Sequence, residues 1–505
     1  MTQSGTKSNT YREILRSSSI IGGAEVINYL VALVRVKVVA VLLGPAGVGV
    51  ISLYVTATEL LGTVTGLGLK SSSVRSIAQA NSKDDPVAVA RTASMLRRLC
   101  WATGTLGWVA SISLALPLSH WMFQSMEHAW ALAILGGTLL MTALSNGQLA
   151  LLQGLRRIGD IARAQVAAAV LNTAVTIVLY AWLREEGIVP VLLANTALTL
   201  LCTWWFARRV ELPGVAMNWE AAVTEAKPML GLGVAMMWSA VLALALDLFI
   251  RTILTRQWGV DATGYYQAAW SLSGLFAGFI LGAMGSDFYP RLTGIIEDRE
   301  AAGRIVNEQT EIGILLALPG LLATLVFAKW VIRILYSAEF APAADVLVWM
   351  VLGVYGRVLS WPMGFIQLAL GAARWFMLTE ALLIAVQAAL AVWLVPRYGV
   401  MGAAYAFVAG EACYAVIMIV VGHVLIGFRW SPAVLRMLLM TACLIGLALV
   451  GERSLHELPT LVFGSVLCAI GSLWSLRGLA QRLGPDHRLI VMAYRIPGLT
   501  LIIGG

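Results

Sequence analysis

Apolar runs of roughly 20 residues, enough for a helix to cross the hydrocarbon core of a bilayer, recur along the whole chain. Only 12% of the 505 residues are charged, about half the share usual for a soluble domain. The runs also lack the polar alternate face of outer-membrane barrel strands. The pattern predicts an all-α polytopic membrane protein with 14 spans, at 19–43, 46–69, 99–118, 129–152, 164–183, 188–206, 229–254, 262–284, 312–331, 344–370, 376–395, 400–426, 433–450 and 459–476.

Lys and Arg are distributed unevenly between alternate loops. With residues 1–18 placed in the cytoplasm, 24 of the 35 Lys and Arg fall on the inside, 5 on the outside and 6 within the bounds of the spans. Because cytoplasmic loops carry the positive excess in membrane proteins, we expect both termini to be cytoplasmic. The net charge of +8 then follows from topology and does not indicate binding to nucleic acid.

Three short motifs occur twice, in the same order. GPAGVG (44–49) matches GVDATG (259–264) at an offset of 215, LLQGLRR (151–157) matches LALGAAR (368–374) at 217, and GIVPVLLA (187–194) matches GVMGAAYA (399–406) at 212. The repeating unit holds six spans, an even number, so the two copies have the same orientation in the membrane. Two such lobes can enclose a central cavity and open it to alternate sides, which is the geometry of a transporter.

The repeat predicts the domain organisation. We expect a cytoplasmic tail (1–18), an N-lobe (19–207), a cytoplasmic linker (208–228), a C-lobe (229–427), two additional spans (428–476) and an amphipathic cytoplasmic tail (477–505).

Four of the cations within predicted spans are candidates for function, because an ionisable group is costly there and often functional. Guanidinium groups bind phosphate oxygens in bidentate pairs, so a cavity that they line would hold an anion, with aromatic side chains against sugar faces. The predicted substrate-binding residues are Arg35, Lys37, Arg251, Arg357, Tyr266 and Trp361.

Internal ion pairing is the alternative for these cations. Asp247 stands four residues before Arg251 on the same helical face and can neutralise it, and Glu25 can do the same for Arg35. The aromatic residues can equally belong to interfacial belts or to ordinary packing.

Five carboxylates within spans are candidates for coupling transport to a proton or sodium gradient. The alternative is a carboxyl held protonated by burial or hydrogen-bonded between helices. No nucleotide-binding loop, nucleophile motif or metal-ligand spacing accompanies them, so we expect no enzyme, no cofactor and no metal site. The candidates are Glu25, Glu59, Asp247, Glu380 and Glu411.

The stretch ILRSSSIIGGAEVINYLVALVRVKVVAVLLGPAGVGVISLY (14–54) resembles the opening of bacterial Wzx-type polysaccharide flippases. GYYQAAW (264–270) and GAMGSDFYPRL (282–292) resemble the second-lobe counterparts, and the resemblance covers residues 12–428. It implies the MOP-superfamily fold, with two six-helix lobes around a central cavity. Arg35 and Lys37 lie in the matching first-span motif. The two C-terminal spans are a departure, because many relatives stop at twelve.

The resemblance also implies a function. Such proteins flip undecaprenyl-diphosphate-linked oligosaccharide repeat units from the cytoplasmic to the periplasmic leaflet of the bacterial inner membrane, by alternating access through a cationic cavity and with an ion gradient as the driving force. The resemblance implies membrane lipids, a polysaccharide polymerase and a chain-length regulator as partners. It also implies that the flippase itself is a monomer.

Two other functions remain open from the sequence. A MATE-type multidrug/cation antiporter would share the fold but needs an acidic and aromatic site, whereas the first span here carries two cations. A glycan polymerase or lipid-linked glycosyltransferase would need a large outside loop or an acidic sugar site at the membrane edge. No outside loop of this chain is long enough to hold a catalytic domain.

Overall fold

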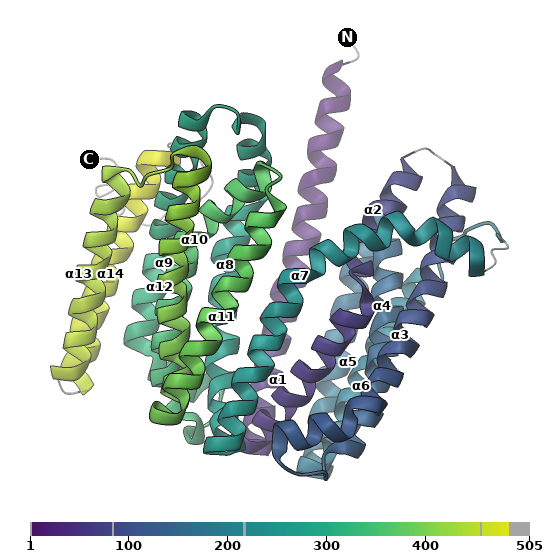
Figure 1. Cartoon of the computed structure of the whole chain (residues 1–505), viewed down its shortest axis with the longest axis horizontal. Coiled ribbons are helices and arrows are strands. Elements are labelled where there is room, and N and C mark those ends of the chain that lie inside the picture. Colours follow the sequence, from purple (N-terminus) through teal and green to yellow (C-terminus); the bar gives the residue numbers. More distant parts are fainter. Residues whose placement is uncertain (1–2, 83–84, 216–218, 455–456, 484–505) are drawn as a thin grey trace. The chain divides into compact units, whose positions relative to one another are not determined.

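The computed structural model of the protein describes residues 3–82, 85–215, 219–454 and 457–483. Over these residues the regular structure is helical throughout (Figure 1), and 11 stretches are long and apolar enough to cross a membrane. Two of them, Gly22–Gly66 and Ile158–Ala207, each combine two expected spans. The expected span at 262–284 lies within a further helix, Val260–Ile295. The prediction of an all-α polytopic membrane protein is confirmed.

The chain divides into two compact units. The first unit contains residues 1–264 and the short segment 335–337. Its helices are α1 (Gln3–Gly66), α2 (Leu69–Asn81), α3 (Pro86–Phe123), α4 (Ala129–Gly154), α5 (Ile158–Leu183), the 3₁₀ turn η1 (Arg184–Gly187), α6 (Ile188–Ala207) and α7 (Trp219–Trp258).

A break at Gly44 divides α1 into two spans. Gly44 has φ 62° and ψ −171°, outside the helical region, and glycine reaches a positive φ without a steric penalty. Pro45 follows, and its missing N–H suits the first position of the next helix. The GPAGVG turn thus joins two helices that the sequence predicted as separate spans.

The two turns of the first repeated motif contact each other. A Cβ added to Gly49 would lie 2.3 Å from the carbonyl oxygen of Val260, and a Cβ on Gly264 would lie 2.0 Å from the carbonyl oxygen of Pro45. Both glycines therefore sit where only a bare backbone fits. At the repeat offset of 215 residues, Pro45 corresponds to Val260 and Gly49 corresponds to Gly264. The two contacts therefore join equivalent positions of the two motifs.

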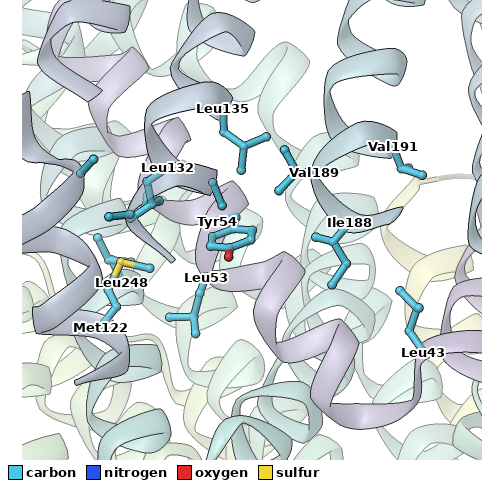
Figure 2. Packing of buried hydrophobic residues seen from close by; sticks show 14 of the residues in the cluster. Leu43, Leu53, Tyr54, Met122, Leu132, Leu135, Ile188, Val189, Val191 and Leu248 are labelled. Carbon is cyan, nitrogen blue, oxygen red and sulfur yellow. The ribbon is translucent and has the colours of Figure 1, made fainter. Parts of the chain in front are cut away.

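A hydrophobic cluster fixes the neighbouring helices around the second half of α1. Tyr54 and Leu53, on α1, pack among Met122, Leu132 and Leu135 from α3 and α4 (Figure 2). The Tyr54 hydroxyl lies 2.6 Å from Nδ1 of His128, at the start of α4, so the one polar atom of the ring has a partner at the edge of the cluster.

The second unit contains residues 265–334 and 338–505. Its helices are the rest of α8 (Val260–Ile295), α9 (Arg299–Leu335), the 3₁₀ turn η2 (Ala338–Phe340), α10 (Pro342–Ala369), α11 (Ala373–Tyr398), α12 (Val400–Ile426), α13 (Pro432–Ser454) and α14 (Glu457–Leu483). The segment before α13 is tied to α9, because Asn307 donates to the Arg429 carbonyl at 3.0 Å and accepts from the Ser431 backbone N–H at 2.8 Å.

Several helices extend beyond their expected ends: α1 begins at Gln3, within the expected tail 1–18, α3 begins at Pro86, α9 begins at Arg299, and α8 ends at Ile295. α7 already begins at Trp219, inside the expected linker 208–228, where the sequence WEAAVTEAK is rich in good helix formers. α14 continues to Leu483, past the expected end at 476, and Arg482 there bonds Glu311 of α9 at 2.8 Å. The rest of the expected amphipathic tail, 484–505, lies outside the described residues.

Candidate functional site

Arg35 lies on the first half of α1, nine residues before the break at Gly44. It is half-buried, and no carboxylate pairs with it in the described parts of the chain. Glu25, its expected partner, is exposed nearly three helical turns away. The group that interacts with it electrostatically is the buried phenol of Tyr180 on α5. The guanidinium of Arg35 is therefore an uncompensated positive charge at the depth of a membrane span.

Two polar residues of α1 lie near Arg35 in sequence. The ammonium of Lys37 donates to the backbone carbonyl of Tyr336, which belongs to the first unit. Asn28 shares a helical face with Arg35 at i+7 spacing, and its side-chain oxygen is buried without a donor among the described residues. An oxygen in this state is ready to accept a hydrogen bond from a ligand hydroxyl.

Arg251 and Asp247 form a buried ion pair on α7. Nη2 of Arg251 lies 3.0 Å from Oδ2 of Asp247, and the two side chains are 2% and 13% exposed. Glu59, on the second half of α1, is close enough for its charge to interact with both. Arg251 is thus neutralised internally, as the ion-pairing alternative expected, and contact with a substrate anion would require this pair to separate.

Glu59 also lines a cavity of the first unit that is rich in hydroxyl groups. This cavity has a volume of about 460 Å³ and lies between α1, α2, α3, α4 and α7. Among the described residues of its lining, nearly all polar groups are neutral, and Glu59 is the single charged side chain. The hydroxyl and amide side chains are Thr58, Thr63, Thr65, Ser73, Thr103, Thr138, Thr142 and Asn146. Such a lining suits a polar, uncharged ligand rich in hydroxyl groups.

Arg357 and Glu411 join α10 to α12 in the second unit. Two guanidinium nitrogens of Arg357 contact Oε1 of Glu411, at 3.1 and 2.6 Å, and Gln387 of α11 donates to the same oxygen at 3.3 Å. Glu411 is 1% exposed, whereas the side chain of Arg357 is 36% exposed. The other oxygen of Glu411 is buried without a partner in the described chain. The Arg357 side chain is thus paired with a buried carboxylate and is itself partly exposed. It also lies over the ring of Phe407.

Glu380 belongs to the same polar layer. It accepts a hydrogen bond of 2.9 Å from the Tyr414 hydroxyl, and one residue earlier Thr379 donates to Gln367 at 3.2 Å. Three helices, α10, α11 and α12, therefore share a ladder of polar side chains within an otherwise apolar bundle. Both Glu380 and Glu411, two of the candidate carboxylates, belong to this ladder.

The two predicted aromatic residues take part in packing. Tyr266 is 2% exposed and stacks on Trp270. Trp361 is half-buried between Phe288 and Phe365, with ring centroids 6.2 and 4.4 Å away. Neither ring lines a described cavity, so the packing alternative describes both in this structure.

Several residues of the site were missed by the sequence analysis. Thr142 and Asn146 face the cavity of the first unit, and no signal marked them, because isolated hydroxyls and amides are common in membrane helices. Gln387 and Tyr414 complete the polar ladder. Gln387 lies on the same helix as Glu380, α11, and Tyr414 lies on the same helix as Glu411, α12. This helical spacing from a candidate carboxylate is the one sequence signal that would have identified them.

This chain is similar in sequence to known proteins. A family model described as "Polysaccharide biosynthesis protein" matches residues 38–345. The lipid III flippases of Escherichia coli (strain K12) and Shigella flexneri are each 23% identical to the chain over 389 residues, which covers 75% of this chain and 90% of each relative. These matches confirm the resemblance to polysaccharide flippases seen in the sequence.

Solved structures share the architecture. The lipid II flippase MurJ in an inward closed conformation aligns with a TM-score of 0.70 at 12% identity, over 92% of this chain and 99% of that chain. An inward-facing multidrug resistance MATE family transporter of the MOP superfamily gives 0.64 at 15% identity, over 79% and 94%. At such identities the likeness concerns the fold, and the MOP-type fold predicted from the sequence is confirmed.

Proposed function

The chain belongs to the polysaccharide biosynthesis protein family, and from this premise we propose that it flips undecaprenyl-diphosphate-linked oligosaccharide repeat units from the cytoplasmic to the periplasmic leaflet of the bacterial inner membrane. It is a multi-pass membrane protein, and its curated relatives are named as flippases of a lipid-linked molecule. Those relatives are not enzymes, in agreement with the expectation from the sequence.

The uncompensated charge of Arg35 is the observation that carries this proposal. A diphosphate crossing the hydrocarbon region needs a compensating cation, and a guanidinium without a carboxylate partner is available to it. Arg35 would bind one phosphate group in a bidentate geometry, and the orphan oxygen of Asn28 would accept a hydrogen bond from a sugar hydroxyl. We propose that Lys37 belongs to the same substrate-binding site as Arg35.

The cavity beside Glu59 supports a glycan as the transported group. Hydroxyl and amide groups exchange hydrogen bonds with sugar hydroxyls, and a lining that is almost free of charge binds them weakly enough for release. A cationic drug would favour a site with several carboxylates and aromatic rings, whereas Glu59 is the single carboxylate that the structure describes in this lining.

We assign ion coupling to the ladder of the second unit. Glu411 holds Arg357 as long as it is ionised. Protonation of Glu411, or neutralisation by a cation at its unpartnered oxygen, would weaken the pair and release the guanidinium, whose side chain is already 36% exposed. The same arginine would then be able to bind the diphosphate. Binding of the driving ion and binding of the substrate would thus be linked through one side chain.

We also propose how the protein alternates access, how it is oriented in the membrane and which proteins receive its product. Two six-helix lobes in parallel repeat would alternate access, with both termini in the cytoplasm as the distribution of Lys and Arg indicates. A polysaccharide polymerase and a chain-length regulator would receive the product from a monomeric flippase. The reciprocal contact of Gly49 and Gly264 supports the repeat on which this model depends.

A genetic experiment tests the assignment of Arg35. In a strain that lacks the gene, lipid-linked oligosaccharide should accumulate and surface polysaccharide should be lost, and the wild-type chain should restore both. Arg35→Ala should fail to restore them at normal expression, Arg35→Lys should restore them in part, and Arg75→Ala, which removes an exposed cation from α2, should behave as wild type. Intact surface polysaccharide in the deletion strain, with hypersensitivity to cationic dyes, would instead support a drug antiporter.

A further inference from the structure

A groove on the first unit, separate from the polar cavity, is lined by α3, α4, α6 and the segment that follows α6. Its volume is about 800 Å³, within the range of sites for small ligands. α4 forms its floor through Leu144, Leu151 and neighbours, and the walls carry exposed Trp101 and Trp204. The lining is mainly apolar, as expected for a groove in contact with lipid chains.

Among the described residues, the one charged side chain in the lining of this groove is Arg97. The exposed guanidinium of Arg97 forms no hydrogen bond or ion pair within the described chain. Arg208 lies over the rings of Trp204 and Trp205, at 4.8 and 3.8 Å from the centroids. A second cation is therefore held against the groove wall. An apolar groove with Arg97 in its described lining and Arg208 beside its wall is complementary to a lipid with a phosphate headgroup.

The groove and the polar cavity are divided by a thin wall. Leu96, Cys100 and Gly147 line both of them. The wall is tight, because a Cβ on Gly147 would lie 2.7 Å from Sγ of Cys100, and one on Gly104 would lie 2.8 Å from Cα of Leu140. A molecule with its sugar in the cavity cannot place its tail in the groove unless α3 and α4 separate. The occupant of the groove is therefore a different molecule from the transported one.

We infer that this groove binds one anionic phospholipid of the surrounding bilayer. Its phosphate would pair with Arg97, within reach of the cation held over Trp204, and one acyl chain would lie along α4 between Trp101 and Leu201. Trp side chains suit this position, because their rings prefer the boundary between headgroups and chains.

Native mass spectrometry of the full-length protein, released from micelles that contain phosphatidylglycerol or phosphatidylcholine, tests this site. Wild type should retain one phosphatidylglycerol in preference to phosphatidylcholine. Arg97→Gln should weaken this retention about ten-fold, because the lipid phosphate loses its charge-assisted hydrogen bond, whereas Arg97→Lys should keep part of it. Leu201→Trp, which fills the groove and leaves Arg97 in place, should also lose the lipid, and Arg75→Gln should retain it.

Three results would overturn the inference. The first is equal retention of phosphatidylglycerol by wild type and Arg97→Gln. The second is equal retention of the anionic and the zwitterionic lipid by wild type. The third is displacement of phosphatidylglycerol by an equimolar amount of undecaprenyl phosphate, which would assign the groove to the polyprenyl lipid. Retention by Leu201→Trp as strong as in wild type would likewise contradict the position of the acyl chain.

Discussion

Gly264 and Pro45 approach each other so closely that a Cβ on Gly264 would lie 2.0 Å from the Pro45 carbonyl oxygen. Under the repeat offset of 215, Pro45 corresponds to Val260 and Gly49 corresponds to Gly264, and a Cβ on Gly49 would lie 2.3 Å from the Val260 carbonyl oxygen. Two turns with related sequences thus meet through equivalent atoms. Such a reciprocal contact is expected of two similar turns related by an approximate two-fold axis.

Gly264→Ala should destabilise the protein by about 1–3 kcal/mol, because the new methyl group meets backbone that has to move. Thermal unfolding of the purified protein in detergent measures the effect. Gly274→Ala is the matched control on the same helix, since nothing lies within 4 Å of its added Cβ. Equal melting temperatures for the two variants would show that the two turns do not pack as described.

Arg357→Met should be strongly destabilising, by about 3–5 kcal/mol, because it leaves the carboxylate of Glu411 buried without its cation. Adding Glu411→Gln should recover most of this loss, and the coupling between the two changes follows from a double-mutant cycle of unfolding free energies. Arg304→Met removes an exposed partner of Glu300 and should cost less than about 1 kcal/mol. Additive effects of Arg357→Met and Glu411→Gln would argue against the pair.

Thr142→Val keeps the side-chain shape and removes a hydroxyl from the polar cavity. We expect slower flipping at unchanged expression, because the glycan loses a hydrogen-bonding group. Accumulated lipid-linked oligosaccharide in cells reports the rate. Thr105→Val, on an exposed position of α3 outside the cavity, should leave the amount at the wild-type level. If both variants accumulate the same amount of substrate, the cavity does not bind the glycan.

His128 should make stability depend on pH. It lies just before α4, stacked on Phe123 with ring centroids 3.8 Å apart, and burial lowers its pKa below the ordinary value of 6.5. The unfolded chain then takes up the proton first as the pH falls, so stability is complete above about pH 6.5 and declines below it. Melting temperatures between pH 7.5 and 5 should fall less steeply for His128→Gln than for wild type and for the exposed-site control His120→Gln. Equal slopes for wild type and His128→Gln would refute the assignment.

The fold was predictable because membrane helices are signalled by apolar length and by the distribution of Lys and Arg between loops. The break at Gly44 was also visible, as the motif GPAGVG. The partners of the charged residues were less predictable. Asp247 and Arg251 stand four residues apart on one helix, and their pairing followed from sequence. Glu411 is 54 residues from Arg357 and reaches it through the packing of α10 on α12, which helical periodicity cannot show. The expected pairing of Glu25 with Arg35 is not found among the described residues, since the two are nearly three turns apart.

Reconstituted flipping of the lipid-linked oligosaccharide tests the central claim most directly. The substrate that accumulates in the deletion strain would be extracted and placed with the purified protein in vesicles, and a membrane-impermeant glycosidase would report the fraction exposed on the outer leaflet. We predict that wild-type protein makes the whole pool accessible over time, while Arg35→Ala leaves it at the fraction seen in protein-free vesicles and Arg75→Ala matches wild type. An accessible fraction that wild-type protein does not raise, or that Arg35→Ala raises as fully as wild type, would contradict the account.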